Sequence, residues 1–529
     1  MKKTTMLLAV LLSACGGGGS DSPTAPAPAP APAPATNSVT FVPQILQGTD
    51  FSGKSLDFDF WVVLSGISSE SLNIKVDTTG DFTPQITRAT NRFKISSAAS
   101  LAPGSYSGNI TISLCRDSAT ICQSPYPGSP WRLPYSFTIL SKTPNITPLQ
   151  KLTGAQRWGN LRANASQTGY ITSTKIDESR FNLRWINEDY YLEAGSYSQS
   201  PVIGEDRVVV YQNSSPLGFA GIREFDGTVA WKNSSASTNG VFTNLALLNN
   251  KVFLLTQNSL FSFDVTTGQQ IAATNSGAYY PSYMVAHDNS IFVGRTGPGF
   301  GFLKFDAESL TQQWAMNNGD DPIQPFAVDA KELISVHGIR VDRASGVKSG
   351  FSRSEPINNY KTSENSSIMV NGQNDVIFSY FNVAAGSSSH ISSYSRSSGT
   401  KNWIINGSFS SSPVLANNII YTTSNISQPK NNEFSEVKAI DALTGKVIWT
   451  LPLPGPLPGN SMPRYELLLV GNHLFASQIG NPASALLAVE ISKQQIVWRY
   501  PISGRLAVSD NGVLYVFGSR PGLTAINLH

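Results

Sequence analysis

Cysteine and histidine are the residue types that could do chemistry in this chain, and both are scarce. The sequence has three cysteines and five histidines among 529 residues. Cys115 and Cys122 are separated by six residues, a spacing that is not a metal-binding signature. In an oxidising compartment the simplest prediction is a structural disulfide between them, with two free thiols as the alternative.

The histidines are isolated from one another in the sequence. His287, His337, His390 and His473 have no partner at the spacing of metal ligands, and the fifth is His529. The sequence also contains no Gly-x-Ser-x-Gly nucleophile motif. These observations predict no catalytic, cofactor-binding or metal-ligating residue.

One segment matches a phosphate-binding motif. Residues 48–55 read Gly-Thr-Asp-Phe-Ser-Gly-Lys-Ser, which fits G-x-x-x-x-G-K-[ST]. That chemistry requires a helix N-terminus directly after the lysine and serine. Residues 56–64 instead alternate apolar and polar side chains, as a strand does. We therefore interpret the match as a coincidental turn.

The first residues have the pattern of an export signal. Residues 1–14 combine Lys2 and Lys3 with a short apolar run and end in Leu12-Ser13-Ala14, directly before Cys15. This context resembles a bacterial lipobox, which predicts that Cys15 is acylated and becomes the mature N-terminus. An ordinary secretory signal with an incidental cysteine is the alternative. Because Gly16 follows Cys15, we expect anchoring to the outer membrane through lipid chains.

Residues 15–37 form a predicted linker, with Gly16 to Gly19 followed by alternating proline and alanine from Ala25 to Ala35. Such a sequence cannot bury a core and favours extended polyproline II. The formal net charge of +3 includes the two lysines of the signal. The mature chain is thus close to neutral, and we expect no nucleic-acid partner.

Residues 38–141 predict a small β-sandwich. Phe58, Phe60 and Val62 belong to one face of an alternating run, with Asp57 and Asp59 on the other face. Several short strands with turn signals between them are typical of an immunoglobulin-like sandwich. Residues 142–157 then read as a second linker.

The rest of the chain repeats one phrase of an apolar run, aspartate, small residues, glycine and tryptophan. The clearest copy is Ala439 to Trp449, where Trp449 lies eight residues after Asp441. Asp, Thr and Gly predict a tight turn between two strands. We expect the tryptophans to lie between neighbouring sheets and to be structural rather than catalytic. The six positions are Trp185, Trp231, Trp314, Trp403, Trp449 and Trp498.

The period of the phrase predicts a β-propeller. Two further copies lack tryptophan, one at Ala272 and one near Gly350, which makes eight outer strands. Spacing of about 43 residues is typical of a four-stranded blade. Residues 181–185 read as an outer strand without an inner partner, and residues 523–528 as an inner strand without an outer one. We therefore predict an all-β chain with an eight-bladed propeller closed by these two segments, and seven blades as the alternative.

The phrase A-x-D-x-x-T-G-x-x-x-W, clearest at Ala439 to Trp449, resembles the repeat of pyrroloquinoline-quinone (PQQ) propellers. The resemblance extends over residues 158–529. The family includes quinoprotein dehydrogenases and also the BamB-type lipoprotein of the outer-membrane assembly machinery, which binds no quinone. In the alcohol dehydrogenases, the family pattern implies a vicinal cysteine pair over the cofactor and acidic and amide ligands for Ca²⁺ beside a catalytic aspartate.

The propeller sequence departs from the enzymes at these features. Residues 158–529 contain no cysteine, and many of their acidic residues are turn aspartates of the phrase; Asp320 and Asp321 read as part of a loop. We therefore expect no cofactor and a non-catalytic binding or scaffold lipoprotein of the bacterial envelope. Its expected partners are envelope or surface proteins. The alternatives are a PQQ-dependent dehydrogenase and a surface carbohydrate- or protein-binding module.

Overall fold

The protein is all-β in the part of the chain that its structure, a computed structural model, describes. One 3₁₀ turn, η1 (Glu178–Arg180), accompanies the strands. No helix among these residues has the length and apolar character needed to cross a membrane. The structure describes residues 38–529 except 67–72, 90, 174–175, 193–199, 213–217, 236–241, 277–282, 296–300, 318–324, 350–366, 373–374, 381–388, 431–432, 455–463, 480–484 and 519–520.

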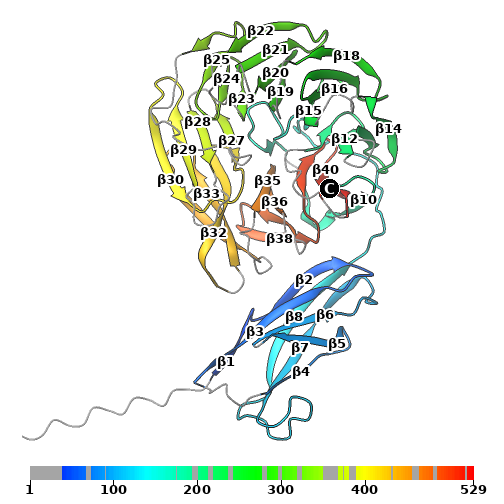
Figure 1. Cartoon of the computed structure of the whole chain (residues 1–529). Helices are drawn as coiled ribbons and strands as arrows, with labels where there is room; N and C mark the ends of the chain where they lie inside the picture. Colours follow the sequence, from blue (N-terminus) through cyan, green and yellow to red (C-terminus); the bar gives the residue numbers. More distant parts are fainter. Residues whose placement is uncertain are drawn as a thin grey trace, which may run out of the picture.

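The N-terminal part consists of two four-stranded sheets that enclose one apolar core (Figure 1). The first has the order β1 (Ser38–Val42), β3 (Asp57–Ser65), β6 (Arg92–Ser97) and β5 (Phe82–Ala89). The second has the order β2 (Leu46–Phe51), β8 (Trp131–Leu140), β7 (Gly104–Cys115) and β4 (Asn73–Asp77).

The alternating run on β3 faces the core as expected. Phe58, Phe60 and Val62 are buried, because successive side chains of a strand point to opposite faces. The phosphate-binding match lies on β2 and on the turn before β3, so that a strand follows Lys54 and Ser55 rather than a helix. The geometry that such a motif requires is therefore missing at this turn.

The strands described between residues 182 and 527 form eight sheets around a ring (Figure 1). Seven consist of consecutive strands, each pairing antiparallel with the next, and we number these blades 1 to 7. Their strands, from the centre outward, are listed here: β11 (Val202–Ile203), β12 (Arg207–Gln212), β13 (Gly218–Arg223), β14 (Val229–Asn233); β15 (Phe242–Leu248), β16 (Lys251–Thr256), β17 (Ser259–Asp264), β18 (Gln270–Asn275); β19 (Tyr283–His287), β20 (Ser290–Arg295), β21 (Gly301–Asp306), β22 (Gln312–Asn317); β23 (Phe326–Val328), β24 (Glu332–Ser335), β25 (Arg340–Asp342), β26 (Lys348–Ser349); β27 (Ser367–Asn371), β28 (Asp375–Tyr380), β29 (Ser389–Ser395), β30 (Lys401–Gly407); β31 (Val414–Ala416), β32 (Ile419–Lys430), β33 (Glu433–Asp441), β34 (Val447–Leu453); β35 (Arg464–Val470), β36 (His473–Ile479), β37 (Leu486–Glu490), β38 (Gln495–Tyr500).

The eighth sheet joins the two ends of the propeller sequence. Strands β39 (Arg505–Val508), β40 (Val513–Phe517) and β41 (Leu523–Asn527) come from the C-terminal end, and β10 (Asn182–Asn187) adds the outer strand. β10 pairs antiparallel with β41, with Asn182 opposite Asn527. The predicted closure by these two segments is confirmed, and we call this sheet blade 8.

The turn aspartate of the phrase organises the backbone between the two outer strands of a blade. Asp441 Oδ1 accepts the backbone N–H groups of Leu443 and Thr444 at 3.0 and 2.7 Å. Gly445 donates its own N–H to the Asp441 carbonyl at 2.8 Å and has φ +73°. An L-residue disfavours this left-handed conformation, so the turn selects glycine.

A second reason for the glycine is the tryptophan of the preceding blade. A Cβ atom on Gly268 of blade 2 would lie 2.5 Å from the indole ring of Trp231 of blade 1. Trp231 Nε1 donates to the backbone carbonyl of Val265 at 2.9 Å. Trp185, Trp314 and Trp403 contact the next blade in the same way, at Gly227, Gly346 and Gly445.

Where blade 2 lacks the tryptophan, blade 3 changes as well. Ala272 of blade 2 replaces tryptophan, and Leu310 of blade 3 occupies the glycine position with φ +56°. Leu310 is buried in the cluster against which Ala272 packs. The leucine thus fills space that an indole ring takes elsewhere.

Blade 4 is joined to blade 5 by ion pairs instead. Arg396 of blade 5 makes ion pairs with Asp329 and, at 3.0 Å, with Glu332 of blade 4. Glu332 also pairs with Arg340. The side chains of Glu332, Arg340 and Arg396 are largely buried, and a buried ion pair is costly to break.

Phe51 of the sandwich packs against the propeller. Phe51 at the end of β2 is buried against Tyr500 at the end of β38, with ring centroids 5.4 Å apart in an edge-to-face arrangement. Phe51 belongs to the same buried cluster as the core of blade 8. The two parts therefore share apolar surface.

A buried carboxyl group lies where blade 8 meets blade 1. Glu224 is fully buried and accepts a hydrogen bond from the Ser509 hydroxyl. Burial raises the pKa of Glu224 to about 7, against the lowering effect of its hydrogen bonds with Ser509 and Asn511. The carboxyl group is thus held in its protonated form over a range of pH in which the unfolded chain ionises it.

The consequence is a pH-dependent stability with a defined sign. Because the folded chain binds this proton more tightly, stability falls as the pH rises from the ordinary pKa of 4.5 to about 7. We expect the Glu224→Gln variant to lose roughly 3 kcal/mol less stability than the unaltered protein over this rise in pH. Urea unfolding of the unaltered protein and of Glu224→Gln at pH 4.5, 6 and 7.5 measures this difference. Parallel pH profiles of the two proteins would contradict the raised pKa of Glu224.

Candidate functional site

The channel at the centre of the ring contains a segment of the chain itself, residues 158–171, which we call the channel plug. Its backbone carbonyls accept N–H groups from the innermost strands of successive blades. The pairs, in order around the ring, are Trp158 with Ile203, Gly159 with Leu247, Ala165 with Val328, Ser166 with Val370, Thr168 with Leu415 and Gly169 with Leu469. The plug ends as β9 (Tyr170–Ile171), which pairs parallel with β35.

Blade 3 contacts the plug through a side chain. The Asn160 amide accepts the N–H of Ala286 at 2.8 Å and donates to the carbonyl of Ala286 at 3.0 Å. Asn160 is buried, so both groups of Ala286 depend on it. With this contact the plug bonds to each of blades 1 to 7.

The plug lies toward one face of the propeller. The two innermost strands of a blade are joined by short turns, such as Asn249-Asn250 and Asn417-Asn418, and we call this the turn face. The plug bonds near the ends of the innermost strands that lead into these turns. The opposite face, which we call the loop face, carries the connections from each outer strand to the next blade.

Charged side chains lie beside the plug toward the loop face. Arg162 of the plug is 9% exposed, and one of its guanidinium nitrogens donates to the Pro413 carbonyl. Glu466 and Arg505, near the starts of β35 and β39, are close enough to act on its charge. Burial lowers the pKa of Arg162, and Glu466 opposes this. Tyr283 belongs to the same group and donates to Gln167 of the plug at 2.7 Å.

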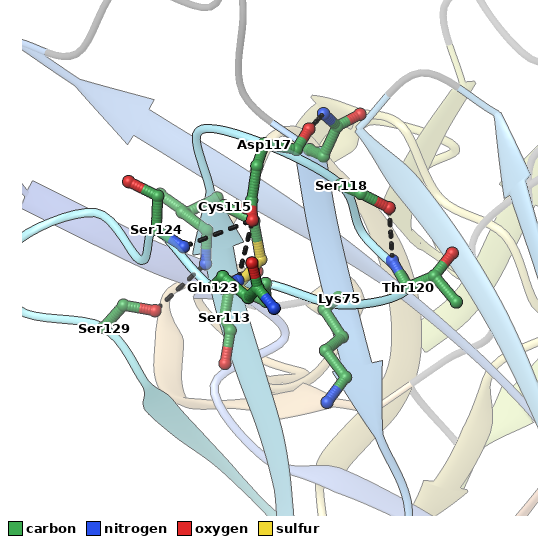
Figure 2. Close-up of a disulfide and its surroundings, with 12 residues drawn as sticks. Lys75, Ser113, Cys115, Asp117, Ser118, Thr120, Gln123, Ser124 and Ser129 are labelled. Carbon is green, nitrogen blue, oxygen red and sulfur yellow. Dashed lines mark hydrogen bonds between the residues drawn. A yellow bond between two sulfur atoms is a disulfide. The ribbon is translucent and has the colours of Figure 1, made fainter.

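The two predicted disulfide cysteines meet at the end of the sandwich. Cys115 and Cys122 are joined by a disulfide with their Cα atoms 5.1 Å apart (Figure 2). The Asp117 carboxylate accepts the N–H groups of Gln123 and Ser124 at 2.7 and 3.3 Å and thereby orders the enclosed loop. The sulfur atoms are bonded to each other, so they are not available as thiolate ligands. Cys15 lies outside the described residues.

The five histidines, for which no site role is predicted, are spread over the propeller. His473 is buried beside Glu178, with 3.3 Å between Nε2 and Oε2, and Glu490 completes a compact group. The Lys493 ammonium makes ion pairs with both glutamates, so this group already contains its own cation. His287 lies at the end of β19, His337 between β24 and β25, His390 on β29 and His529 after β41.

Two of the six predicted tryptophans, Trp449 and Trp498, lie beside aromatic side chains instead of a turn glycine. Trp449 packs near Tyr421 within its own blade. Trp498 stacks on Tyr500 at 4.9 Å and meets Phe181 edge-to-face at 5.5 Å. The glycine position after Trp449 is Gln494, with φ +54°. Asp320 and Asp321 lie outside the described residues.

The arrangement does not fit a quinone cofactor with its calcium ion. The propeller sequence lacks the cysteine pair, and the innermost strands of seven blades bond to the plug. In the charged group beside the plug, the Glu466 carboxylate is already paired with Arg505 at 2.6 Å. We therefore derive no redox step from these residues.

The comparisons with known proteins agree with the geometry of the ring. A family model described as "Outer membrane protein assembly factor BamB" matches residues 387–528, from blade 5 to blade 8. The chain contains a PQQ-like β-propeller. No curated protein matches its sequence.

Solved structures with a similar propeller include dehydrogenases and a BamB protein. The quinohemoprotein alcohol dehydrogenase ADHIIG of Pseudomonas putida HK5 is 12% identical, with 70% of this chain and 80% of that chain covered and a TM-score of 0.50. BamB from Moraxella catarrhalis is 13% identical, with 67% and 98% covered and a TM-score of 0.43. A europium-containing methanol dehydrogenase is 11% identical, with 68% and 88% covered and a TM-score of 0.47. At these identities the likeness concerns the fold alone.

The plug and its arginine are the features that sequence reasoning missed. Residues 158–171 belong to no copy of the phrase. The composition of this segment could have indicated the plug, because glycine, alanine, asparagine, serine and threonine dominate it. Small residues let a backbone approach other strands closely. A Cβ on Gly159, for example, would lie 2.6 Å from the Leu247 carbonyl oxygen.

Proposed function

We propose that this chain is a lipid-anchored, non-catalytic binding or scaffold protein of the bacterial cell envelope. Its propeller presents a surface to other envelope proteins, and outer-membrane protein assembly is the process to which the matching family model points. The anchor is the acylated Cys15, and residues 15–37 serve as the spacer. The immunoglobulin-like sandwich of residues 38–141, the linker of residues 142–157 and the propeller of residues 158–529 follow.

The observation that carries this proposal is the channel plug. In a propeller the channel and the loops are the usual binding surfaces. Here the plug bonds to the channel walls in seven blades, through its backbone in six and through the Asn160 side chain in blade 3, which favours binding at the outer faces over chemistry inside the channel. The family's alternative function, quinone-dependent alcohol oxidation, has no matching residues at this place.

Crosslinking in the intact envelope tests the proposal, with Cys15→Ala as the control. We expect the unaltered chain in the membrane fraction, crosslinked to defined envelope proteins, because acyl chains hold it at the bilayer. The Cys15→Ala chain should move to the soluble fraction and lose these crosslinks. Dye-linked alcohol oxidation by the purified chain with added PQQ and Ca²⁺ would contradict the proposal, as would membrane retention of Cys15→Ala.

A further inference from the structure

Arg162 is a buried cation that the described side chains leave incompletely satisfied. Its Nη2 donates to the Pro413 carbonyl, but Nη1 is buried and has no hydrogen-bond partner among the described residues. A guanidinium group has five N–H donors in a fixed plane. A buried donor without a partner costs about 1–3 kcal/mol, and more when it is charged. An orphaned cation in a native structure points to an ion or ligand that completes it.

A second arginine adds to this excess of positive charge. Arg505 Nη1 bonds Glu466 Oε2 at 2.6 Å, whereas its Nε is buried and unpartnered within the described part of the chain. Arg162, Arg505 and Glu466 together carry two positive charges and one negative charge. The Arg505 and Glu466 side chains remain 19% and 12% exposed, so solvent reaches this group.

The position of Arg162, Arg505 and Glu466 indicates the face from which a ligand would enter. Tyr283, Glu466 and Arg505 lie near the starts of β19, β35 and β39, which is the loop-face end of the innermost strands. The plug closes the channel on the other side through its bonds near the turns. A ligand for Arg162 would therefore arrive through the loop face.

We propose that the loop-face mouth of the channel binds a carboxylate of an acidic segment in a partner protein, held by Arg162 and Arg505. This inference rests on the proposed function and names the face and the chemistry of the partner. A carboxylate suits the site because its two oxygens accept the parallel N–H groups of a guanidinium. Glu466 occupies one such position on Arg505 and thereby competes with the partner's carboxylate.

Titration calorimetry of the full chain tests the site with two probes, a tetraglutamate peptide and glutarate, and with a tetraglutamine peptide as the neutral control. We expect the tetraglutamate peptide to bind and the tetraglutamine peptide not to bind. Arg505→Gln should weaken binding at least tenfold, because it removes a charge-assisted hydrogen bond. Glu466→Gln should strengthen binding several-fold, because it removes the competing carboxylate.

Arg157→Gln is the matched control variant. Arg157 directly precedes the plug but pairs with Glu205 and bonds Asn250 at the turn face, so we expect its loss to leave peptide binding within twofold. No binding of the tetraglutamate peptide would overturn the proposal, as would equal weakening by Arg157→Gln and Arg505→Gln. Binding of glutarate without the peptide would overturn the assignment to a partner protein. If the Arg505→Gln chain still forms the same envelope crosslinks, this inference fails while the proposed function stands.

Discussion

Gly268→Ala is expected to destabilise the propeller by about 2–5 kcal/mol, because it combines backbone strain with a steric clash. The left-handed conformation at φ +71° costs an L-residue about 1–2 kcal/mol. The new Cβ would also lie 2.5 Å from Cδ2 of Trp231 on the preceding blade, and overpacking of this kind costs about 1–3 kcal/mol more. Urea unfolding followed by tryptophan fluorescence measures the loss.

Gly372→Ala is the control for the backbone contribution. Gly372 also lies in the propeller and has φ +59°, but a Cβ there would meet no atom of the described residues within 4 Å. We expect this variant to lose only about 1–2 kcal/mol. If the two variants were equally stable, the indole ring would not be what excludes a side chain at position 268.

Asn160→Ala is the second variant with a large expected effect. It removes both hydrogen bonds to Ala286 and leaves a backbone N–H and a C=O buried without their partner. Each such group costs about 1–3 kcal/mol, so we expect a loss of about 2–6 kcal/mol in the free energy of unfolding. Amide hydrogen exchange at Ala286 gives a local readout, which should accelerate in the variant.

Asn289→Ala provides the matched control for this experiment. Asn289 is exposed, and its amide makes long contacts of 3.4 and 3.5 Å with Asp306 and Asn249. We expect a change within about 0.5 kcal/mol, as for most surface substitutions. Unchanged protection of Ala286 in Asn160→Ala would mean that the plug does not hold blade 3.

The plug gives the two faces of the propeller different roles. On the turn face the segment before the plug contacts blade 8, where the Leu152 N–H donates to the Asp510 carbonyl at 2.7 Å and Lys151 pairs with the Asp510 carboxylate. On the loop face Tyr283, Glu466 and Arg505 lie near the starts of innermost strands, close enough to Arg162 to act on its charge. A partner that approaches from the loop face would thus meet the channel's unsatisfied cations, whereas toward the turn face the plug bonds to the innermost strands.

Much of the fold could be predicted because the interactions that form the repeat join residues close together in the sequence. The turn of Asp441, Thr444 and Gly445 depends on residues within five positions of one another, so a sequence pattern shows it directly. The closing pair of β10 and β41 could also be predicted, since each segment lacked a partner in its own neighbourhood. Local hydrogen bonding and alternation of side chains are properties of short segments.

The contacts between distant segments were decided by the tertiary structure alone. No pattern in the sequence says that Gly268 must accommodate the ring of Trp231, or that Leu310 fills the space left by Ala272. The same holds for Arg162, whose neighbours Glu466 and Arg505 lie more than 300 residues further along the chain. Closing the ring brings the innermost strands of all blades to one axis, and only then does a segment such as the plug meet them. The repeat in the sequence therefore determined the blades, while the packing of blades around that axis decided which residues form the candidate site.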